Sequence, residues 1–208
     1  MLLYAEDQRV MFYVYLLPRQ WRRWFVFSRS VGGLWVGEQT NRRVWLWSRV
    51  VPMGWLLAVM VAQHVHRNQM IWTGPGAGLK PDEEWRKDRL MPLVLGEVWR
   101  KWWQVYVDNW DAGKVGPWPE MARQVGVPDD RQEAVRRAWR EGGVPRSEDK
   151  SVEGGWESAS LGKELNGRAG WQAPTLEKLV ATLGTTLWLA GEDKVTERAL
   201  RVGVGSVV

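Results

Sequence analysis

Residues 102–111 read WWQVYVDNWD. The first six are aromatic or β-branched apart from one Gln and predict a β-strand, and Asp108–Asp111 predict a turn after it. The strongest functional signal of the chain lies here, at Tyr106–Asn109, on a strand, a turn and a second strand. A carboxylate exposed on a tight hairpin suits a hard divalent cation such as Mg²⁺, which prefers oxygen ligands. Asp108 is therefore a candidate metal ligand.

A second carboxylate must come from another segment, because one Asp cannot hold Mg²⁺ alone. Asp7 is the natural candidate, since it lies beside a predicted strand and just before the aromatic pair Phe12–Tyr13. A simpler interpretation stands beside each assignment. An isolated Asp in a turn is more often a turn former than a ligand. Phe12 and Tyr13, in an apolar run, are by default core residues.

The first half of the chain predicts strands, a hairpin and a helix. The run VMFYVYLL at 10–17 is rich in β-branched and aromatic residues and predicts a strand or extended chain. Residues 24–27 predict a short strand, and 44–50 predict its hairpin partner after a glycine-rich turn. Apolar periodicity then predicts a helix over Leu56–Gln69.

The second half predicts three helices and some short extended pieces. Capping Asp residues, a Gly pair and a Pro mark the helix ends. The helices are expected at 82–99, 129–141 and 175–188, and the extended pieces at 158–172. Strands and helices alternate irregularly and include hairpins, which predicts an α+β fold with a mainly antiparallel sheet.

The composition excludes some kinds of site and favours others. The 208 residues contain no Cys, which excludes disulfides and Cys-based zinc sites. His64 and His66 lie on different faces of any helix, so two separate surface or core histidines are expected rather than a joint metal site.

Charge and Trp are concentrated in the first half of the chain. Residues 1–110 hold 15 Lys and Arg, 9 Asp and Glu, and 12 of the 17 Trp. Basic charge interleaved with aromatic rings is typical of surfaces that bind a phosphate backbone and stacked bases. A compositional bias of the lineage would also explain the Trp excess.

No secretory signal or membrane span is predicted. Glu6, Asp7 and Arg9 lie where a signal peptide would need an apolar segment. The longest apolar run, 50–62, is interrupted by a Pro and a Gly and is shorter than the roughly 20 residues that span a bilayer. An intracellular protein without a membrane partner is expected.

Six short segments resemble, in the same order, motifs in the palm of retroelement reverse transcriptases. They are Asp7–Tyr13 (DQRVMFY), Val51–Trp55 (VPMGW) with the helix through Gln63, Tyr106–Asn109 (YVDN), Gly143–Ser151 (GVPRSEDKS), Leu161–Gly162 with Asn166–Gly167, and Pro174–Lys178 (PTLEK). Each match is short, and their order carries the resemblance. It implies an antiparallel-sheet polymerase palm packed against helices, with partial fingers, over 1–160. A primer-grip-like hairpin and the start of a thumb would follow over 161–190, and a loose tail over 191–208.

The resemblance implies RNA-directed DNA polymerisation. Asp7 and Asp108 would hold two Mg²⁺ or Mn²⁺ ions, which activate the primer 3′-hydroxyl and hold the triphosphate. Asn109 and Lys150 would complete the catalytic set, and Lys150 would neutralise or protonate the leaving pyrophosphate. The implied partners are an RNA or DNA template–primer and deoxynucleoside triphosphates.

The resemblance also implies binding residues. Those for the template and the incoming nucleotide are Phe12, Tyr13, Pro52, Met53, Gly54, Trp55, Gln63 and Tyr106, and those of the primer grip are Leu161 and Gly162. The ring of Phe12 would exclude a 2′-hydroxyl by contact. Gly54 would let the backbone approach the template–nucleotide pair closely.

Departures from the family pattern bear on activity. Asn109 stands where the family has a second Asp, and Met53 where it has Gln, so one negative charge and one polar side chain are missing. Asp111 would partly replace the missing carboxylate at position 109 only if its side chain points to the same side of the hairpin. The chain begins six residues before Asp7, where the family has fingers, and 72–98 is longer than the family's connection. The hypothesis is a truncated or decayed polymerase that is inactive as this chain alone.

Two other functions remain open. The chain could be a non-catalytic, basic, Trp-rich module that binds single-stranded nucleic acid, which requires several Trp rings exposed on one basic face. It could also be a structural remnant whose Trp residues are buried. The polymerase hypothesis instead requires Asp7 and Asp108 side by side on one sheet.

Overall fold

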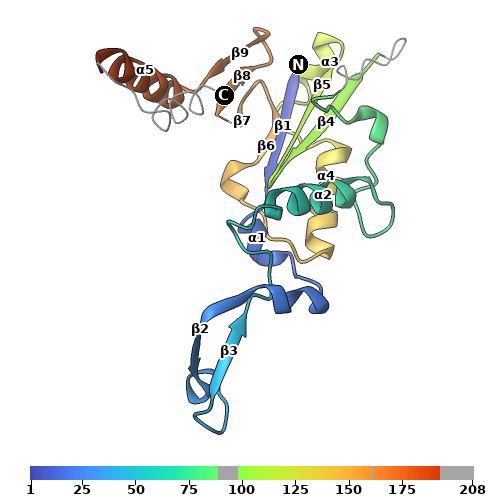
Figure 1. The fold of residues 1–208 in the computed structure, drawn as a ribbon. Helices are drawn as coiled ribbons and strands as arrows, with labels where there is room; N and C mark the ends of the chain where they lie inside the picture. The colour runs from blue at the N-terminus through green and yellow to red at the C-terminus, as the bar shows by residue number, and fades with distance from the viewer. Residues whose placement is uncertain (89–97, 161, 193–208) are drawn as a thin grey trace.

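The structure is a computed structural model that describes residues 1–88, 98–160 and 162–192 (Figure 1). Its main sheet has the strand order β4-β5-β1-β6, and all three pairings are antiparallel. The four strands are β1 (Leu2–Asp7), β4 (Arg100–Tyr106), β5 (Asn109–Val115) and β6 (Val152–Gly155). An α+β architecture with antiparallel sheets is thus confirmed.

Two smaller sheets flank the main one. One is the hairpin of β2 (Val26–Gly32) and β3 (Arg43–Trp47), and the other contains β7 (Glu157–Ser160), β8 (Lys163–Asn166) and β9 (Trp171–Pro174). The α-helices are α1 (Met11–Val14), α2 (Ala58–Ile71), α3 (Trp118–Ala122), α4 (Asp130–Glu141) and α5 (Leu176–Gly191). Short 3₁₀ turns lie at Arg19–Trp24, Gly33–Val36, Pro81–Glu83 and Glu148–Lys150.

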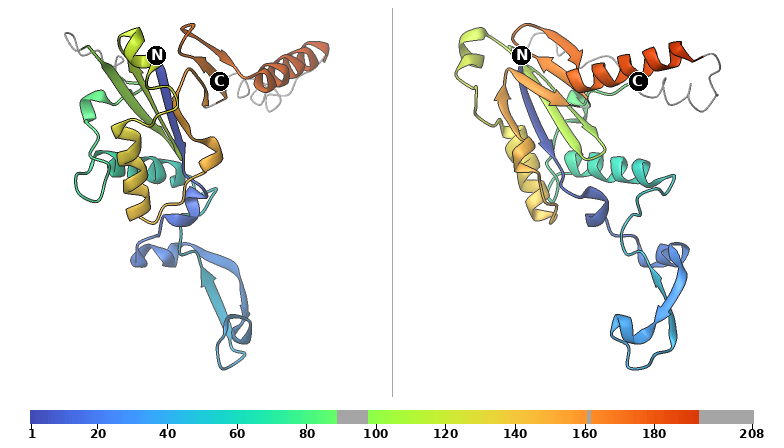
Figure 2. Two further views of the ribbon diagram at one scale, coloured as in Figure 1. Left: turned by 180° about the vertical axis from the view of Figure 1, so that it is seen from behind. Right: turned by 90° about the vertical axis from the view of Figure 1, so that its left-hand side faces the viewer.

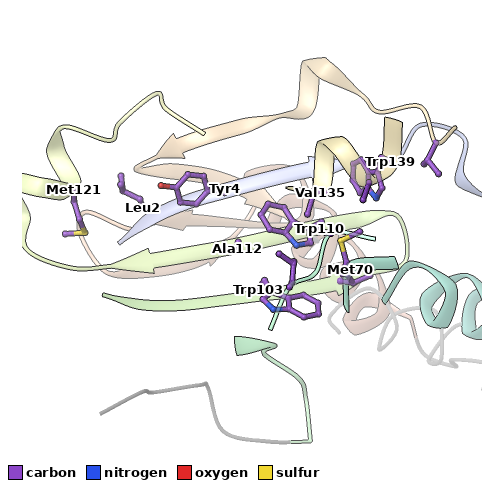
Figure 3. Packing of buried hydrophobic residues seen from close by; sticks show 14 residues of the cluster. Leu2, Tyr4, Met70, Trp103, Trp110, Ala112, Met121, Val135 and Trp139 are labelled. Atoms are coloured by element: carbon purple, nitrogen blue, oxygen red, sulfur yellow. The ribbon is translucent and has the colours of Figure 1, made fainter. Parts of the chain in front are cut away.

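The core lies between one face of the main sheet and helices α2 and α4 (Figure 3). Trp103 of β4 and Trp110 of β5 are fully buried there and pack in one cluster with Met70 of α2 and with Val135 and Trp139 of α4. Alternate strand residues point to opposite faces of a sheet. The residues between these core positions, Gln104 and Asp111 among them, therefore point to the face that the two helices leave uncovered.

The β2–β3 hairpin and the 3₁₀ turn at Arg19–Trp24 project away from the main sheet (Figures 1 and 2). We call residues 19–49 the arm. A second cluster joins it to the body: the buried residues Tyr15, Leu17 and Val51 pack with Ala58 and Ala62 of α2, and Phe25 lies against them. The tip of the arm therefore extends beyond the core that anchors its base.

Several predicted elements are confirmed. Helix α2 starts two residues after the expected 56–69 start and ends two residues later. Helix α4 begins after Asp129, whose side chain accepts hydrogen bonds from the backbone N–H groups of Arg131 and Gln132. Strand β3, the extended pieces β7–β9 and helix α5 also lie where they were expected.

The strand expected at 10–17 is wrong. Strand β1 ends at Asp7 instead, and Val10 adopts a left-handed conformation (φ 52°) that leads the chain into α1. A helical turn lets Met11 and Tyr15, four residues apart, enter the same cluster.

The helix expected at 82–99 is wrong where the structure describes it; residues 89–97 lie outside the described part. Helical structure ends with the 3₁₀ turn at Glu83, because Glu84 is buried and binds the guanidinium of Arg67 at 2.6 and 2.8 Å. The backbone N–H of Trp85 donates to the carbonyl of Trp103. These long-range contacts outweigh the local helix signal.

No helix among the described residues combines the length and the apolar character that crossing a membrane requires.

Candidate functional site

The site begins at the turn between β4 and β5. The turn was expected over Asp108–Asp111, which is wrong: it is shorter, because Tyr106 pairs with Asn109 and leaves only Val107 and Asp108 between the strands. Asp7, the last residue of β1, pairs with Asn109 from the other side. The N–H of Gln8 also donates to the carbonyl of Asp108 at 2.9 Å. Asp7, at the end of β1, and Asp108, in the β4–β5 turn, therefore lie at the same end of the sheet.

Asp108 is partly buried at this turn, close to the charge of Asp7. Burial raises the pKa of its carboxyl above the ordinary value, and the negative charge of Asp7 raises it further. A backbone hydrogen bond and the charge of Lys150 act in the opposite direction. The amide of Asn109 donates to Asp108 Oδ1 at 3.0 Å. The two carboxylates therefore interact electrostatically at this end of the sheet.

Both oxygens of Asp7 have donors from the segment after α4. The hydroxyl of Ser147 donates to Oδ1 and Lys150 Nζ donates to Oδ2, each at 3.0 Å. The hydrogen bond and the charge of Asp7 raise the pKa of Lys150 above its ordinary value. Lys150 is thus the local counter-ion of Asp7, and most of its side chain remains exposed.

Asp111 points to the same face of the sheet as Asp7 and Asn109, since Asn109 and Asp111 are two residues apart on β5. These three residues and Lys150 line one cavity of about 290 Å³. Asp111 Oδ2 accepts hydrogen bonds from Ser160 Oγ at 2.7 Å and Gln104 Nε2 at 3.1 Å. Burial raises the pKa of Asp111, the two hydrogen bonds lower it, and the charge of Asp7 raises it.

Helix α2 holds the turn in place. Gln63 Nε2 donates to the carbonyl of Val105 at 2.8 Å, and the N–H of Val107 donates to Gln63 Oε1 at 2.6 Å. Three residues later on the same helix face, His66 Nδ1 lies 2.7 Å from the carbonyl of Val107. Val107 has φ 55°, an unfavourable conformation for a β-branched residue, so the turn is strained and depends on these contacts.

His66 is expected to make folding pH-dependent. Burial lowers its pKa to about 4, against 6.5 in an unfolded chain. As the pH falls below about 6.5 the unfolded chain takes up a proton that the folded protein does not, so stability is lost progressively down to about pH 4. The loss amounts to about 3 kcal/mol in the free energy of unfolding. Urea unfolding between pH 7 and pH 4 measures it.

The matched control is His64, which is exposed on the same helix. His66→Gln should flatten the pH dependence relative to the wild type, whereas His64→Gln should leave it unchanged. Equal pH dependence in both variants would show that His66 does not take up its proton at a lowered pKa. The expected separation of the two histidines is confirmed, since His64 is exposed and His66 is buried.

The aromatic residues assigned to the nucleotide differ in exposure. Phe12 is half-buried against the cluster beneath α2, so its core role is confirmed. Tyr13 is exposed, so its default assignment to the core is wrong. Tyr106 is also exposed, next to the turn. The amide of Gln63, assigned to the template, is used within the fold to hold the turn.

The segment assigned to the template grip forms the turn before α2. Met53 is exposed. Gly54 has φ 88°, a backbone conformation that by itself favours glycine, with or without a bound template. Pro52 is half-buried. Trp55 packs edge-on against Trp21 and Phe25 at the base of the arm.

Of the two residues assigned to the primer grip, the structure describes Gly162, just before β8. Leu161 lies outside the described residues. Gly162 has φ 71°, and its carbonyl accepts a hydrogen bond from the N–H of Thr175 at the start of α5. Ser160, the last residue of β7, is the residue that bonds Asp111. The hairpin is thus connected to the open face of the main sheet.

Within the described part of the chain, no group of three or more His, Asp or Glu side chains is arranged as a metal site. Sequence reasoning missed four polar residues that hold the site: His66, Gln104, Ser147 and Ser160. Gln104 had a usable signal, since it is the one polar position within 102–107 and alternates with core residues. Ser147 and Ser160 had no comparable signal in the sequence.

Neither a protein-family model nor a curated protein sequence matches the chain. Among solved structures it resembles a foamy viral protease-reverse transcriptase dRH in complex with double-stranded DNA, with a TM-score of 0.56, 14% identity, and coverage of 99% of this chain and 26% of that chain. It also resembles a foamy viral protease-reverse transcriptase in complex with an RNA/DNA hybrid, with a TM-score of 0.54, 14% identity, and coverage of 99% and 20%.

The chain therefore spans about a quarter or less of the length of these structures. At this identity the likeness shows the fold alone. The chain has a mixed α/β fold with antiparallel sheets that is similar to a fragment of reverse transcriptase.

Proposed function

We propose that the chain forms the palm of a retroelement-type, RNA-directed DNA polymerase. Its activity would be template-directed nucleotidyl transfer assisted by Mg²⁺ or Mn²⁺. The observation that carries the proposal is the placement of Asp7 at the end of β1 beside Asp108 in the β4–β5 turn. The order of the six motifs and the fold likeness support it. Its partners would be a template–primer and deoxynucleoside triphosphates.

In this proposal Asp7 and Asp108 would hold the divalent cation. Asp7 and Asp108 supply hard oxygen donors, and the pKa of Asp108 is raised in part by the negative charge of Asp7, which a bound cation would compensate. When bound, such ions supply charge neutralisation at the reacting phosphate. Asn109 contributes a neutral amide, so cation affinity is expected to be lower than with a third carboxylate.

Lys150 has a direct role in this proposal. Its ammonium group neutralises Asp7 in the absence of substrate, at 3.0 Å, and most of its side chain is exposed. A flexible four-carbon stem lets the ammonium turn from Asp7 toward an incoming phosphate. The hydroxyl of Ser147 would keep Asp7 oriented during that exchange.

Loss of either carboxylate is expected to weaken metal binding at the site. Asp7→Asn and Asp108→Asn should each weaken Mn²⁺ binding, measured by titration calorimetry, by at least about tenfold, because ligand charge sets affinity for hard cations. Any extension of a DNA primer on an RNA template that the wild type shows with Mn²⁺ should be absent in both variants.

Asp82→Asn is the matched control, since Asp82 is exposed in the loop before β4. It removes the same charge and should leave both measurements unchanged. Mn²⁺ affinity that is equal in all four proteins, or extension that persists in Asp7→Asn and Asp108→Asn, would contradict the proposal.

A further inference from the structure

The arm carries the basic excess of the protein. Residues 19–49 contain seven Arg and five Trp but a single acidic residue, Glu38. Glu38 forms an exposed ion pair with Arg42 at 3.7 Å. The net charge of the arm is therefore +6, whereas the whole chain has +5. Charge of this density over 31 residues attracts a polyanion.

One face of β3 combines this charge with exposed aromatic rings. Arg43, Trp45 and Trp47 alternate along the strand, so their side chains point to the same face. Trp45 is 56% exposed and Trp47 is 54% exposed. Arg43 Nε donates to Ser30 Oγ at 3.0 Å, and Ser30 is the cross-strand partner of Trp45. The guanidinium of Arg43 thus lies on the face of the hairpin that carries Trp45 and Trp47.

The backbone spacing between Trp45 and Trp47 matches twice the stacking distance of nucleic acid bases. Residues two apart on an antiparallel strand are about 6.8 Å apart. Stacked bases repeat about every 3.4 Å along a strand. A base placed between Trp45 and Trp47 would therefore have one stacking distance on either side. Trp35, at the tip of the arm, is a further exposed ring and is 89% exposed. Trp24 is also exposed, and the guanidinium carbon of Arg23 lies 5.0 Å from its ring centroid.

We propose that the arm is a binding site for single-stranded nucleic acid, separate from the Asp7–Asp108 site. The bases stack on Trp45 and Trp47, and arginines of the arm contact the phosphates. Single strands are favoured over duplexes because their bases are free to stack on side chains. A second copy of the chain is a poor occupant, since two arms of +6 repel each other.

The base of the arm is joined to the body next to α2. Its base packs through Phe25 on Trp55, with ring centroids 5.0 Å apart, and Trp55 precedes α2. Helix α2 in turn holds the turn that carries Asp108. The binding proposal does not depend on catalysis at that turn, because it rests on the charge and the exposed rings of the arm alone.

Binding of labelled oligo(dT) to the full chain, followed by fluorescence anisotropy, tests the site. Trp45→Ala/Trp47→Ala should weaken binding at least about tenfold, because each stacked base contributes substantially to affinity. Trp188→Ala is the control, an exposed Trp on α5 far along the chain from the arm, and it should bind as the wild type does. Since Trp45 and Trp47 are exposed, thermal unfolding should stay near that of the wild type.

Salt dependence tests the pairing of arginines with phosphates separately. Arg29→Gln/Arg43→Gln should reduce the slope of log affinity against log salt by about 0.7 for each phosphate that is no longer neutralised. Arg137→Gln/Arg140→Gln changes two arginines of α4 instead and should keep the wild-type slope. Asp7→Asn should leave oligo(dT) affinity undiminished, so failure of the catalytic proposal and failure of this one are distinguishable.

Four outcomes would overturn the proposal. They are oligo(dT) affinity unaffected by the Trp45/Trp47 change, equal decreases in arm and control variants, a decrease confined to Asp7→Asn, and a dimer in sedimentation that the arm variants dissociate. The last would assign the arm to self-association. Selective loss of affinity in both arm variants, with the wild-type monomer retained, is the result expected.

Discussion

Asn109→Asp is expected to strengthen Mg²⁺ and Mn²⁺ binding by about 10- to 100-fold and to increase primer extension. The side chain at 109 lies on the same face of the sheet as Asp7 and Asp111. A unit charge about 4 Å from another is worth about 4 kcal/mol at an effective dielectric constant of 20, part of which solvation removes. Each 1.4 kcal/mol that remains is tenfold in affinity. Titration calorimetry with Mn²⁺ measures the effect.

The same substitution should destabilise the metal-free protein. An added carboxylate is repelled by Asp7 and Asp108, and the pKa of Asp108 is already raised in part by the charge of Asp7. The melting temperature should therefore fall without metal and recover when Mn²⁺ is added. Asn41→Asp, in the exposed loop of the arm, makes the same charge change at a distance and should show neither effect. An unchanged Mn²⁺ affinity in Asn109→Asp would mean that the cation is not held at this end of the sheet.

Glu6→Ala is expected to lower the free energy of unfolding by about 3–5 kcal/mol. The Glu6 side chain is fully buried and forms an ion pair with Arg136 at 2.6 Å. It also accepts hydrogen bonds from Gln132 Nε2 at 2.8 Å and Ser151 Oγ at 3.0 Å, and Arg146 approaches it to 3.3 Å. The substitution removes the buried carboxylate that joins these groups, and it leaves Arg136 with Glu133 and Glu153 as its partners, both of them more exposed than Glu6. Breaking a buried charged network carries a cost of this size. Denaturant unfolding measures it.

Glu148→Ala provides the control for that measurement. Glu148 pairs with Arg146 at 3.6 Å but is 80% exposed, and exposed pairs contribute at most about 1 kcal/mol. Similar decreases in stability in the two variants would contradict the buried-network explanation. The difference matters for the candidate site, because Glu6 ties β1 to α4 and to the segment that carries Ser147 and Lys150. Its removal should therefore also disturb the neighbouring Asp7.

Local signals predicted some elements well. Helix α4 has an Asp cap and a Gly pair at its end, and helix α2 has an apolar stripe along one side, so each is encoded by neighbouring residues. The 82–88 segment carries equally good helix signals. It is not an α-helix, because Glu84 binds Arg67 and Trp85 pairs with β4. Contacts between residues far apart in the chain are invisible to a local pattern.

The sequence by itself determined the candidate pair Asp7 and Asp108, the basic, Trp-rich first half, and the α+β class, because each is a property of local composition and spacing. The tertiary structure decided what surrounds that pair. Ser147 and Lys150 donate hydrogen bonds to Asp7 although more than 130 residues separate them in the chain. Asp111 points to the same face of the main sheet as Asp7. His66 and Gln63 contact the strained β4–β5 turn. These arrangements follow from strand register and helix packing, which fix the direction of each side chain only after distant segments have come together.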